Sequence, residues 1–324
     1  MKLCEGDTIA FYSPSIQATH LYKDRYARAC NYLKNKGFNL KPGKLTEKSD
    51  FYRSGTITDR ANELNSLIRD PNVKCIMSTI GGSNSSSILP YIDYQAIIEN
   101  PKIFIGYSDV TSILMAIYAK TGMTTYYGPA LVASFGEFEP LVSQTYDSFI
   151  EVINRNTDSP FRYQKPATWT DEFIDWKVQV NVKSVYPNKW IFNGKSVVEG
   201  RVIGGNLSTM SSIWGSTYMP NIMEGDILLI EDSNQSIDIV ERLFSLLMLS
   251  GVFEKVSAII LGKHEQFDDC KSNRKPIDVL LEILTNNDIP ILYDFDCCHT
   301  HPMLTMPLGS QVRIDFDEET IELI

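Results

Sequence analysis

The chain has 324 residues, of which 43% are hydrophobic and 22% are charged, and its formal net charge is −10. This length is enough for two domains of about 150 residues each. The acidic balance and the lack of a basic stripe argue against a nucleic-acid-binding protein. No run approaches the roughly 18 apolar residues of a membrane span, and the N-terminus has no apolar signal region. We therefore expect a cytoplasmic protein that contacts no membrane.

The first half alternates short apolar runs with helical patterns. Strands are predicted over residues 6–14, 74–82 and 102–108, and helices over residues 20–37, 58–73, 86–101 and 109–122. In the last helix, Val110, Ile113, Leu114 and Ile117 form one apolar stripe. Such alternation predicts a parallel sheet with helices on its faces, and ligands bind at the carboxyl ends of such strands.

The composition of the sequence changes between residues 159 and 200, where Pro, Trp and polar residues are frequent and apolar residues follow no clear period. We interpret this stretch as a linker plus an ordered loop region. Beyond it, strands are predicted over residues 200–205, 226–232, 256–263, 290–295, 311–316 and 320–324, and helices over residues 236–251 and 276–287. This pattern predicts a second, mixed domain, so we divide the chain into domains 1–165 and 166–324.

Ser108 follows an apolar run that stops at a sharp turn before a predicted helix. A serine on such a turn can be a nucleophile, because the N–H groups at the helix start can stabilise an oxyanion. The sequence here, Gly106-Tyr107-Ser108-Asp109-Val110, lacks the second glycine of the familiar Gly-x-Ser-x-Gly elbow. Taken alone, the pattern leaves two roles open for Ser108, a nucleophile and a helix N-cap.

Two other strand ends carry candidate site residues. Gly81 and Gly82 allow the backbone to approach a ligand closely, so the Gly82 N–H is a candidate oxyanion donor, although a simple turn explains the glycines equally well. Glu231 ends the apolar run 226–232. It can orient a histidine, or it can be a solvated strand-end charge like its neighbour Asp232.

His299 and His301 are two of only four histidines and follow Cys297 and Cys298. Histidine is the usual general base for a serine nucleophile. The cluster lacks the Cys-x-x-Cys spacing of a convincing zinc site, and the cysteines can simply be small buried residues. Catalysis, structure and a metal-binding module all stay open at this point. The six scattered cysteines form no disulfide framework, which fits a reducing compartment.

Four segments resemble, in this order, motifs of the LD-carboxypeptidase family of serine peptidases: "GYSDVTSILMAIYAKTGMTTYYGP", "VIGGNLSTM", "DILLIEDS" and "CCHTHPMLTMPLG". The segments "PKIFIGYSDVTSI" and "GVFEKVSAIILGKHEQFDD" are similar to its microcin C self-immunity branch. The resemblance covers nearly the whole chain. It implies an α/β fold in which an N-terminal parallel-sheet α/β domain (flavodoxin/amidotransferase-like) carries Ser108. A C-terminal mixed α/β domain with a small β-barrel-like sheet would carry Glu231 and His299.

The resemblance further implies a catalytic triad of Ser108, His299 and Glu231. Cys298-His299-Thr300 stands where the family usually has Gly-His-Thr. His299 would take the Ser108 proton, Glu231 would orient the imidazolium, and the N–H groups of Gly82 and Asp109 would form the oxyanion hole. No metal or organic cofactor is implied, and the resemblance implies a homodimer.

The substrate implied by the immunity branch is a small peptidyl nucleotide. Members of that branch cleave the amide between an aspartate and a nucleotide-like group in processed microcin C, which gives self-immunity and antibiotic resistance. Trp176 and Trp190 are candidates for an aromatic platform under the base, or they are core or loop residues. Two alternatives stay open: a murein tetrapeptide LD-carboxypeptidase in cell-wall recycling, and a non-catalytic protein that binds small molecules.

Overall fold

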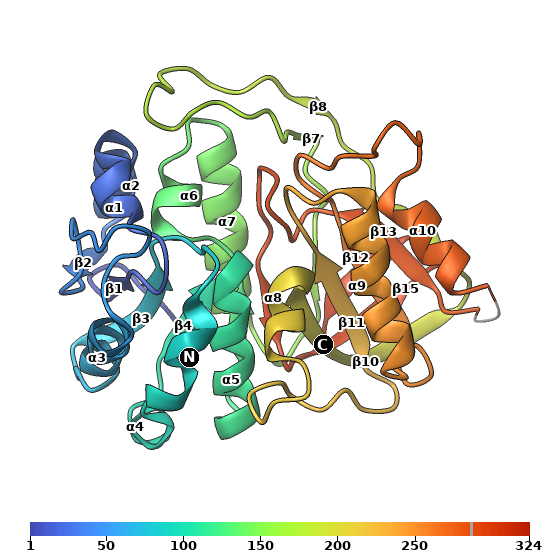
Figure 1. Cartoon of the computed structure of the whole chain (residues 1–324), viewed down its shortest axis with the longest axis horizontal. Coiled ribbons are helices and arrows are strands. Elements are labelled where there is room, and N and C mark those ends of the chain that lie inside the picture. The colour runs from blue at the N-terminus through green and yellow to red at the C-terminus, as the bar shows by residue number, and fades with distance from the viewer. Residues whose placement is uncertain (286–287) are drawn as a thin grey trace.

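The computed structural model describes residues 1–285 and 288–324, and two large β-sheets organise it (Figure 1). In the first sheet, in the order β14-β5-β4-β3-β1-β2, strands β1 to β5 are parallel and β14 is antiparallel to β5. The strands are β1 (Thr8–Tyr12), β2 (Asn39–Pro42), β3 (Val73–Ser78), β4 (Ile103–Gly106), β5 (Thr125–Tyr127) and β14 (Met306–Leu308). Strands β1, β3 and β4 are largely buried apolar runs, as expected for parallel strands covered on both faces.

Helices flank this first sheet. They are α1 (Ala18–Leu21), α2 (Lys23–Asn35), α3 (Ile57–Ile68), η1 (Ser85–Tyr91), α4 (Tyr94–Glu99), η2 (Ser108–Val110), α5 (Thr111–Thr121), α6 (Leu131–Phe135) and α7 (Leu141–Asn154). α3 begins with a capping box, in which the Thr56 hydroxyl accepts the Asp59 N–H at 3.1 Å and the Asp59 carboxylate accepts the Thr56 N–H at 3.3 Å. α5 ends at Gly122, whose φ of 70° is the left-handed conformation that glycine adopts readily.

The second sheet has the order β6-β16-β15-β10-β11-β12-β13-β9 and curls into a half-barrel. The strands are β6 (Phe161–Arg162), β9 (Ile191–Asn193), β10 (Val197–Asn206), β11 (Ile227–Glu231), β12 (Ala258–Gly262), β13 (Ile291–Phe295), β15 (Gln311–Asp315) and β16 (Thr320–Leu323). The helices of this half are α8 (Leu207–Ile213), α9 (Ile237–Leu249) and α10 (Pro276–Ile283). The long strand β10 pairs antiparallel with β15 along its first half and parallel with β11 along its second half, so it joins two differently built parts of the sheet.

Helix α5 lies between the two halves of the molecule (Figure 1). It packs against α8 and β10 of the second half and against η1, α4 and β5 of the first. Every residue from Thr111 to Ile117 is buried. The helix therefore packs on several sides, and not only along the single apolar stripe that the sequence predicted. Because α5 starts three residues after Ser108, this contact places Ser108 at the boundary between the halves.

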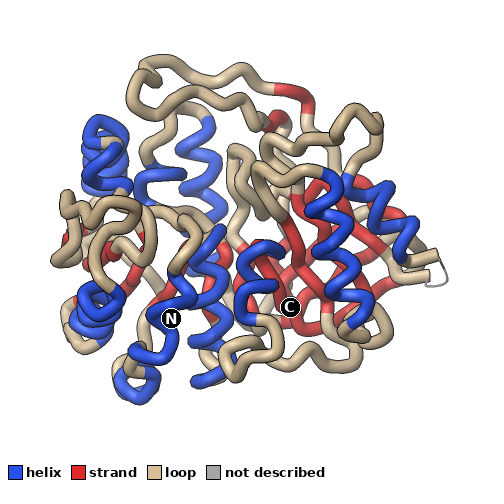
Figure 2. Tube along the Cα trace, in the orientation of Figure 1, coloured by secondary structure: helices blue, strands red, loops and turns tan. Residues whose placement is uncertain are grey.

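Two short strands each pair with the sheet of the other half of the chain. Strand β14 comes from the C-terminal half but extends the first sheet, and β6 precedes residue 165 but extends the second sheet. The domain boundary at residues 165 and 166 therefore stays a proposal. Residues 170–185 form a long loop between the two strands of a separate small sheet, β7 (Thr168–Trp169) and β8 (Tyr186–Pro187). The loop runs along the top of Figure 1 above α6 and α7, and Figure 2 shows how little regular structure it contains.

The predicted α/β fold class is confirmed. The main predicted strands and helices are present, but the predicted helix 86–101 is divided into η1 and α4, because Pro90 lies within it and Asp93 caps a new start. The predicted helix 276–287 ends at Ile283, and residues 286 and 287 lie outside the described residues. The short elements β2, β5, α6, α8 and β14 and the longer helix α7 were not predicted. Within the described residues, no helix is both long and apolar enough to cross a membrane.

Candidate active site

Ser108 lies on a strained turn between β4 and α5. Its φ of +63° is uncommon for a residue with a side chain, and such strain is found where a turn must expose a functional group. Gly81 packs directly against it: a Cβ at position 81 would lie 2.7 Å from the Ser108 Cβ and 2.9 Å from its Oγ. A glycine is therefore required at position 81 to leave room for the Ser108 side chain.

Glu231 and His299 form a buried pair beside this turn. Glu231 ends β11 with 0% exposure, and one of its oxygens lies 2.6 Å from the His299 Nδ1. Its other oxygen accepts hydrogen bonds from the Tyr127 hydroxyl at 2.5 Å and from the Asn206 amide at 3.1 Å. The Tyr127 hydroxyl in turn accepts the Ser108 N–H at 3.2 Å, so a short chain of hydrogen bonds connects all of these groups.

The loop after β3 lies against the Ser108 turn. The Asp109 carboxylate accepts the N–H groups of Asn84 and Ser85, both at 2.9 Å, and the Ser85 hydroxyl at 2.7 Å, which fixes the loop to the turn. Gly82 adopts φ +145°, a conformation that strongly favours glycine. Within the part of the chain that the structure describes, the N–H groups of Gly82 and Asp109 have no internal acceptor. Both donors are therefore available to a ligand.

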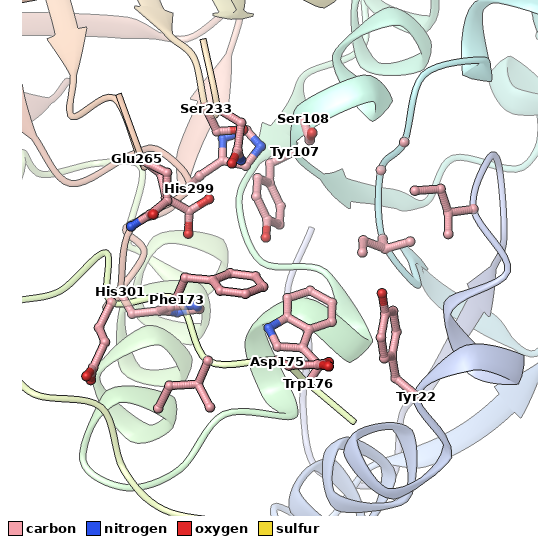
Figure 3. Close-up of a pocket in the computed structure, with 18 of the residues that line it drawn as sticks. Tyr22, Tyr107, Ser108, Phe173, Asp175, Trp176, Ser233, Glu265, His299 and His301 are labelled. Carbon is pink, nitrogen blue, oxygen red and sulfur yellow. The ribbon is translucent and has the colours of Figure 1, made fainter. Parts of the chain in front are cut away.

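Ser108 and His299 line the same cavity of about 320 Å³, together with Gly82 and Tyr107 (Figure 3). The ring of Tyr107 packs edge-on against His299, with ring centroids 4.8 Å apart. Glu231 does not line this cavity, and its carboxylate contacts the Nδ1 of His299.

Aromatic rings form the far wall of the cavity, where Phe173, Trp176 and Tyr22 lie in a row in Figure 3. Tyr22 contacts the edge of the Trp176 ring at 5.1 Å between centroids, and the Arg25 guanidinium lies 4.3 Å from the ring centroid of Trp176. The structure therefore places the first of the two predicted tryptophans in the cavity.

The structure does not place Trp190 there. This residue is only 9% exposed, packs against Phe295 and donates its indole N–H to Asp296 at 2.6 Å. Trp190 therefore does not line this cavity, whereas Trp176 does.

Two family models match the chain: the LD-carboxypeptidase N-terminal domain over residues 9–128 and the LD-carboxypeptidase C-terminal domain over residues 199–314. The chain belongs to the LD-carboxypeptidase family. The family resemblance noted in the sequence is therefore confirmed, and the protein is an enzyme of the serine carboxypeptidase type.

Within this family, the chain is 59% identical to a putative carboxypeptidase of Vibrio cholerae, over 98% of this chain and 95% of that one. It is 56% identical to the microcin C7 self-immunity protein of Escherichia coli, over 99% and 94%. A solved structure of the microcin C7 self-immunity protein matches with a TM-score of 0.98, over 99% of this chain and 97% of that one. Other structures of that protein contain aspartyl sulfamoyl adenosine or glutamyl sulfamoyl guanosine. A murein tetrapeptide carboxypeptidase of Pseudomonas aeruginosa is more distant, at 25% identity over 86% and 84%.

The chain differs from the usual family motif at Cys298, and the structure shows how the side chain fits. Cys298 is fully buried, and its Sγ lies 3.1 Å from the Thr300 hydroxyl. Across from it, a Cβ at Gly262 would lie 3.0 Å from the Cys298 Cβ and 2.8 Å from the Glu231 Cβ. The glycine at position 262 thus leaves the space that Cys298 occupies, and His299 keeps its bond to Glu231.

The buried Glu231–His299 pair shifts the pKa of both members. Burial by itself lowers the pKa of His299, but the charge and hydrogen bond of Glu231, with smaller effects of Glu265 and Asp232, raise it to about 9. Burial by itself raises the pKa of Glu231, but the charge and hydrogen bond of His299 lower it below its usual range. The pair is therefore ionised near neutral pH.

His301 has a different environment from His299. Burial and the nearby charge of Lys183 lower the pKa of His301 to about 3, so its ring is neutral at ordinary pH. Its backbone N–H and C=O pair with Thr170 at 2.9 and 2.8 Å, which ties the His299 loop to the start of the 170–185 loop.

Several site residues were missed from the sequence. Tyr127 ends the three-residue strand β5, which is too short to give a periodic signal. Asn206 directly follows the glycines of "VIGGN" at the end of β10, so the same strand-end argument that picked out Glu231 could have found it. Asp232 was interpreted only as a solvated charge, yet it is 2% exposed and accepts the Ser208 hydroxyl at 2.6 Å.

Proposed function

We propose that this protein cleaves the amide bond of processed microcin C-like aminoacyl nucleotides, with Ser108 as nucleophile, His299 as general acid and base, and Glu231 as the residue that orients His299. The observation that carries the proposal is the 2.6 Å contact between Glu231 and His299 at a cavity that Ser108 also lines. Such a reaction would detoxify an antibiotic of this type.

In the proposed mechanism, His299 removes the proton from the Ser108 Oγ, which attacks the carbonyl carbon of the scissile amide. The N–H groups of Gly82 and Asp109 stabilise the oxyanion. His299 then gives its proton to the leaving nitrogen, and a water molecule activated by His299 hydrolyses the acyl-enzyme. The Glu231 carboxylate, 2.6 Å from the His299 Nδ1, stabilises the imidazolium in each of these steps.

The substrate class is supported by the aromatic wall of the cavity. A nucleobase needs a flat apolar partner, and Trp176 offers one that Arg25 and Tyr22 already hold in place. The 56%-identical self-immunity protein has been solved with aspartyl sulfamoyl adenosine and with glutamyl sulfamoyl guanosine, and each of these ligands contains a nucleobase. We infer that the nucleotide part of the substrate lies against Trp176.

The charges of the cavity argue against the murein alternative. A murein tetrapeptide ends in a carboxylate, which needs a cationic partner. Among the described residues that line the cavity, Lys183 is the only lysine or arginine, and its ammonium is engaged with Glu137 at 3.6 Å. Glu172, Asp175 and Glu265 line the same cavity and would repel that carboxylate. The non-catalytic alternative does not fit a chain that is an enzyme of this family.

We further propose that the chain is a cytoplasmic homodimer and that its domains meet near residues 165 and 166. The family models support this division because they match separate regions on either side of it.

The test is a mass-spectrometric cleavage assay with the purified protein and with Ser108→Ala. Each is incubated with a processed microcin C analogue and with a murein tetrapeptide. We expect Ser108-dependent loss of the nucleotide part from the first compound and no change in the second. Release of D-alanine from the second compound alone would assign the protein to murein recycling, and cleavage of neither would refute the proposed triad.

A further inference from the structure

A second cavity, of about 260 Å³, meets the first one at Ser108. Both cavities are lined by Gly82, Ser108 and Ser233, but only the first is lined by His299. Under the proposed function, on which this inference rests, the group that receives the proton of His299 leaves through the first cavity. The acyl group that stays on Ser108 must then occupy the second one.

One wall of the second cavity is formed by Ser208, Thr209 and Ser212 of α8, and the protons of these hydroxyls are already used. The Ser208 hydroxyl donates to Asp232 at 2.6 Å, the Thr209 hydroxyl to the Asn206 side-chain oxygen at 2.8 Å, and the Ser212 hydroxyl to the Thr209 carbonyl at 2.7 Å. Each hydroxyl has one proton and two lone pairs, so all three present acceptor oxygens to the cavity. The wall therefore offers hydrogen-bond acceptors to a ligand.

The charged residues near the second cavity also disfavour a negatively charged ligand. Asp232 and Asp109 line the second cavity, and Asn206 connects Asp232 to the buried Glu231 with bonds of 3.1 Å to each. Among the described residues that line this cavity there is no lysine, arginine or histidine. A carboxylate placed against the α8 wall would face acceptor oxygens and like charge without a cationic partner, which is unfavourable in a partly dry site. The donors that also line the cavity, the Ser83 and Ser233 hydroxyls and the Gln235 amide, are neutral and do not balance its charge.

We propose that the second cavity selects an acyl residue whose side chain donates hydrogen bonds without carrying negative charge, such as an asparaginyl or glutaminyl group. Aspartyl and glutamyl groups fit the same space but supply only acceptors. The specificity of this chain thus differs from that expected by analogy with the self-immunity relative, which has been solved with aspartyl and glutamyl ligands.

The experiment compares asparaginyl sulfamoyl adenosine with aspartyl sulfamoyl adenosine, which have nearly the same shape. Mass spectrometry gives kcat/KM for both compounds with the purified full chain, and Ser108→Ala serves as the blank. We expect kcat/KM to be at least about tenfold higher for the asparaginyl compound, in line with the effect of one unpaired charged hydrogen bond.

Gln235 allows a charge-inserting test with a matched control. Its side chain lines the second cavity, and within the described residues it makes no hydrogen bond, so replacing it removes no internal contact. Gln235→Lys should raise kcat/KM for the aspartyl compound about tenfold relative to the asparaginyl one, because it supplies the missing cation. Gln235→Met, which has a similar length but no charge, should leave the aspartyl compound disfavoured.

An aspartyl compound cleaved as fast as or faster than the asparaginyl one by the unmodified chain would overturn the inference while leaving the proposed function intact. A failure to cleave either compound in a Ser108-dependent way would instead refute the proposed function itself.

Discussion

The Nδ1 of His299 lies 2.6 Å from a carboxylate oxygen of Glu231, and both side chains are buried where the two sheets meet. Glu231 comes from the end of β11, whereas His299 comes from the loop between β13 and β14. The second carboxylate oxygen is held by Tyr127, which belongs to the first sheet. This carboxylate therefore joins groups from both halves of the molecule.

Replacing the charge of this carboxylate should slow the reaction without unfolding the protein. In Glu231→Gln, a neutral amide cannot stabilise the imidazolium, so we expect kcat to fall by at least about 100-fold. Steady-state kinetics with a processed microcin C analogue measures this, and circular dichroism checks the fold. An unchanged kcat in a folded variant would show that Glu231 has no part in catalysis.

The raised pKa of His299 predicts an alkaline activity profile. The base must be neutral to accept the Ser108 proton, so kcat/KM should rise with pH and level off above about 9. In Glu231→Gln, the midpoint of the remaining activity should move toward the ordinary histidine pKa of 6.5. A midpoint that stays in place would exclude His299 as the titrating group.

The raised pKa of His299 also affects the stability of the fold. Activity should rise with pH, whereas this contribution to stability should fall with pH. Because the folded-state pKa of His299 exceeds its ordinary value of 6.5, the ion pair stabilises the fold fully below pH 6.5. This contribution is lost as the pH rises through about 9. Thermal unfolding at a series of pH values should therefore show a larger Tm difference between the unmodified chain and Glu231→Gln at pH 6 than at pH 10.

Trp176 should contribute to binding more than to the chemical step. Stacking of a base on an aromatic ring is worth about 1–3 kcal/mol, so Trp176→Ala should raise KM for the nucleotide substrate roughly 5- to 150-fold with a smaller change in kcat. Trp190→Phe is the control. It should lower Tm, because it removes the 2.6 Å bond to Asp296, but leave KM unchanged.

Gly81→Ala should block Ser108 while leaving the fold largely intact. The added Cβ would lie 2.9 Å from the Ser108 Oγ, so we expect loss of labelling by a serine-reactive probe, followed by mass spectrometry. Gly122→Ala is the matched control, because a Cβ there meets no atom within 4 Å. It should cost about 1 kcal/mol of stability through its left-handed backbone and keep full labelling. Equal labelling of both variants would refute the tight contact at position 81.

The buried Arg25–Glu137 pair should matter for stability and for the loop that carries Trp176. Arg25 is 0% exposed, lies 3.0 Å from Glu137 and also donates to Gln179 of the 170–185 loop. Arg25→Met would leave the buried Glu137 carboxylate with Lys183, 3.6 Å away, as its remaining cationic partner, so we expect a loss below the about 3–5 kcal/mol of a wholly unpaired buried charge. Chemical denaturation measures this loss, and in the double variant with Glu137→Gln, which keeps the shape of the side chain without its charge, part of it should be recovered. If the double variant is as unstable as the single one, packing rather than charge is responsible.

The main features of the fold could be read from the sequence because they depend on local patterns. The buried apolar runs ending at Gly106 and Glu231 marked strands, and ends of parallel strands are where site residues lie. The resemblance to the family motif predicted His299 as the catalytic histidine. Its pairing with Glu231 could not be deduced from spacing, because 68 residues separate the two in the chain.

Other parts of the site depend on tertiary structure alone. Trp176 and Trp190 have similar surroundings in the sequence, and only the path of the 170–185 loop separates the cavity residue from the buried one. The acceptor wall of α8 was also invisible, because "LSTMSSI" has no strong apolar period and the partner of the Ser208 hydroxyl, Asp232, lies 24 residues further along the chain. Neither feature has a local signature.

The exchange of β14 and β6 between the sheets has a mechanical consequence. The loop that carries His299 is fastened at one end to the second sheet through β13 and at the other end to the first sheet through β14. Strand β14 pairs with β5, which itself pairs with β4, the strand that leads to Ser108. The spacing between the serine and the histidine is thus set by rows of backbone hydrogen bonds, and it does not rely on a hinge between two separately folding bodies.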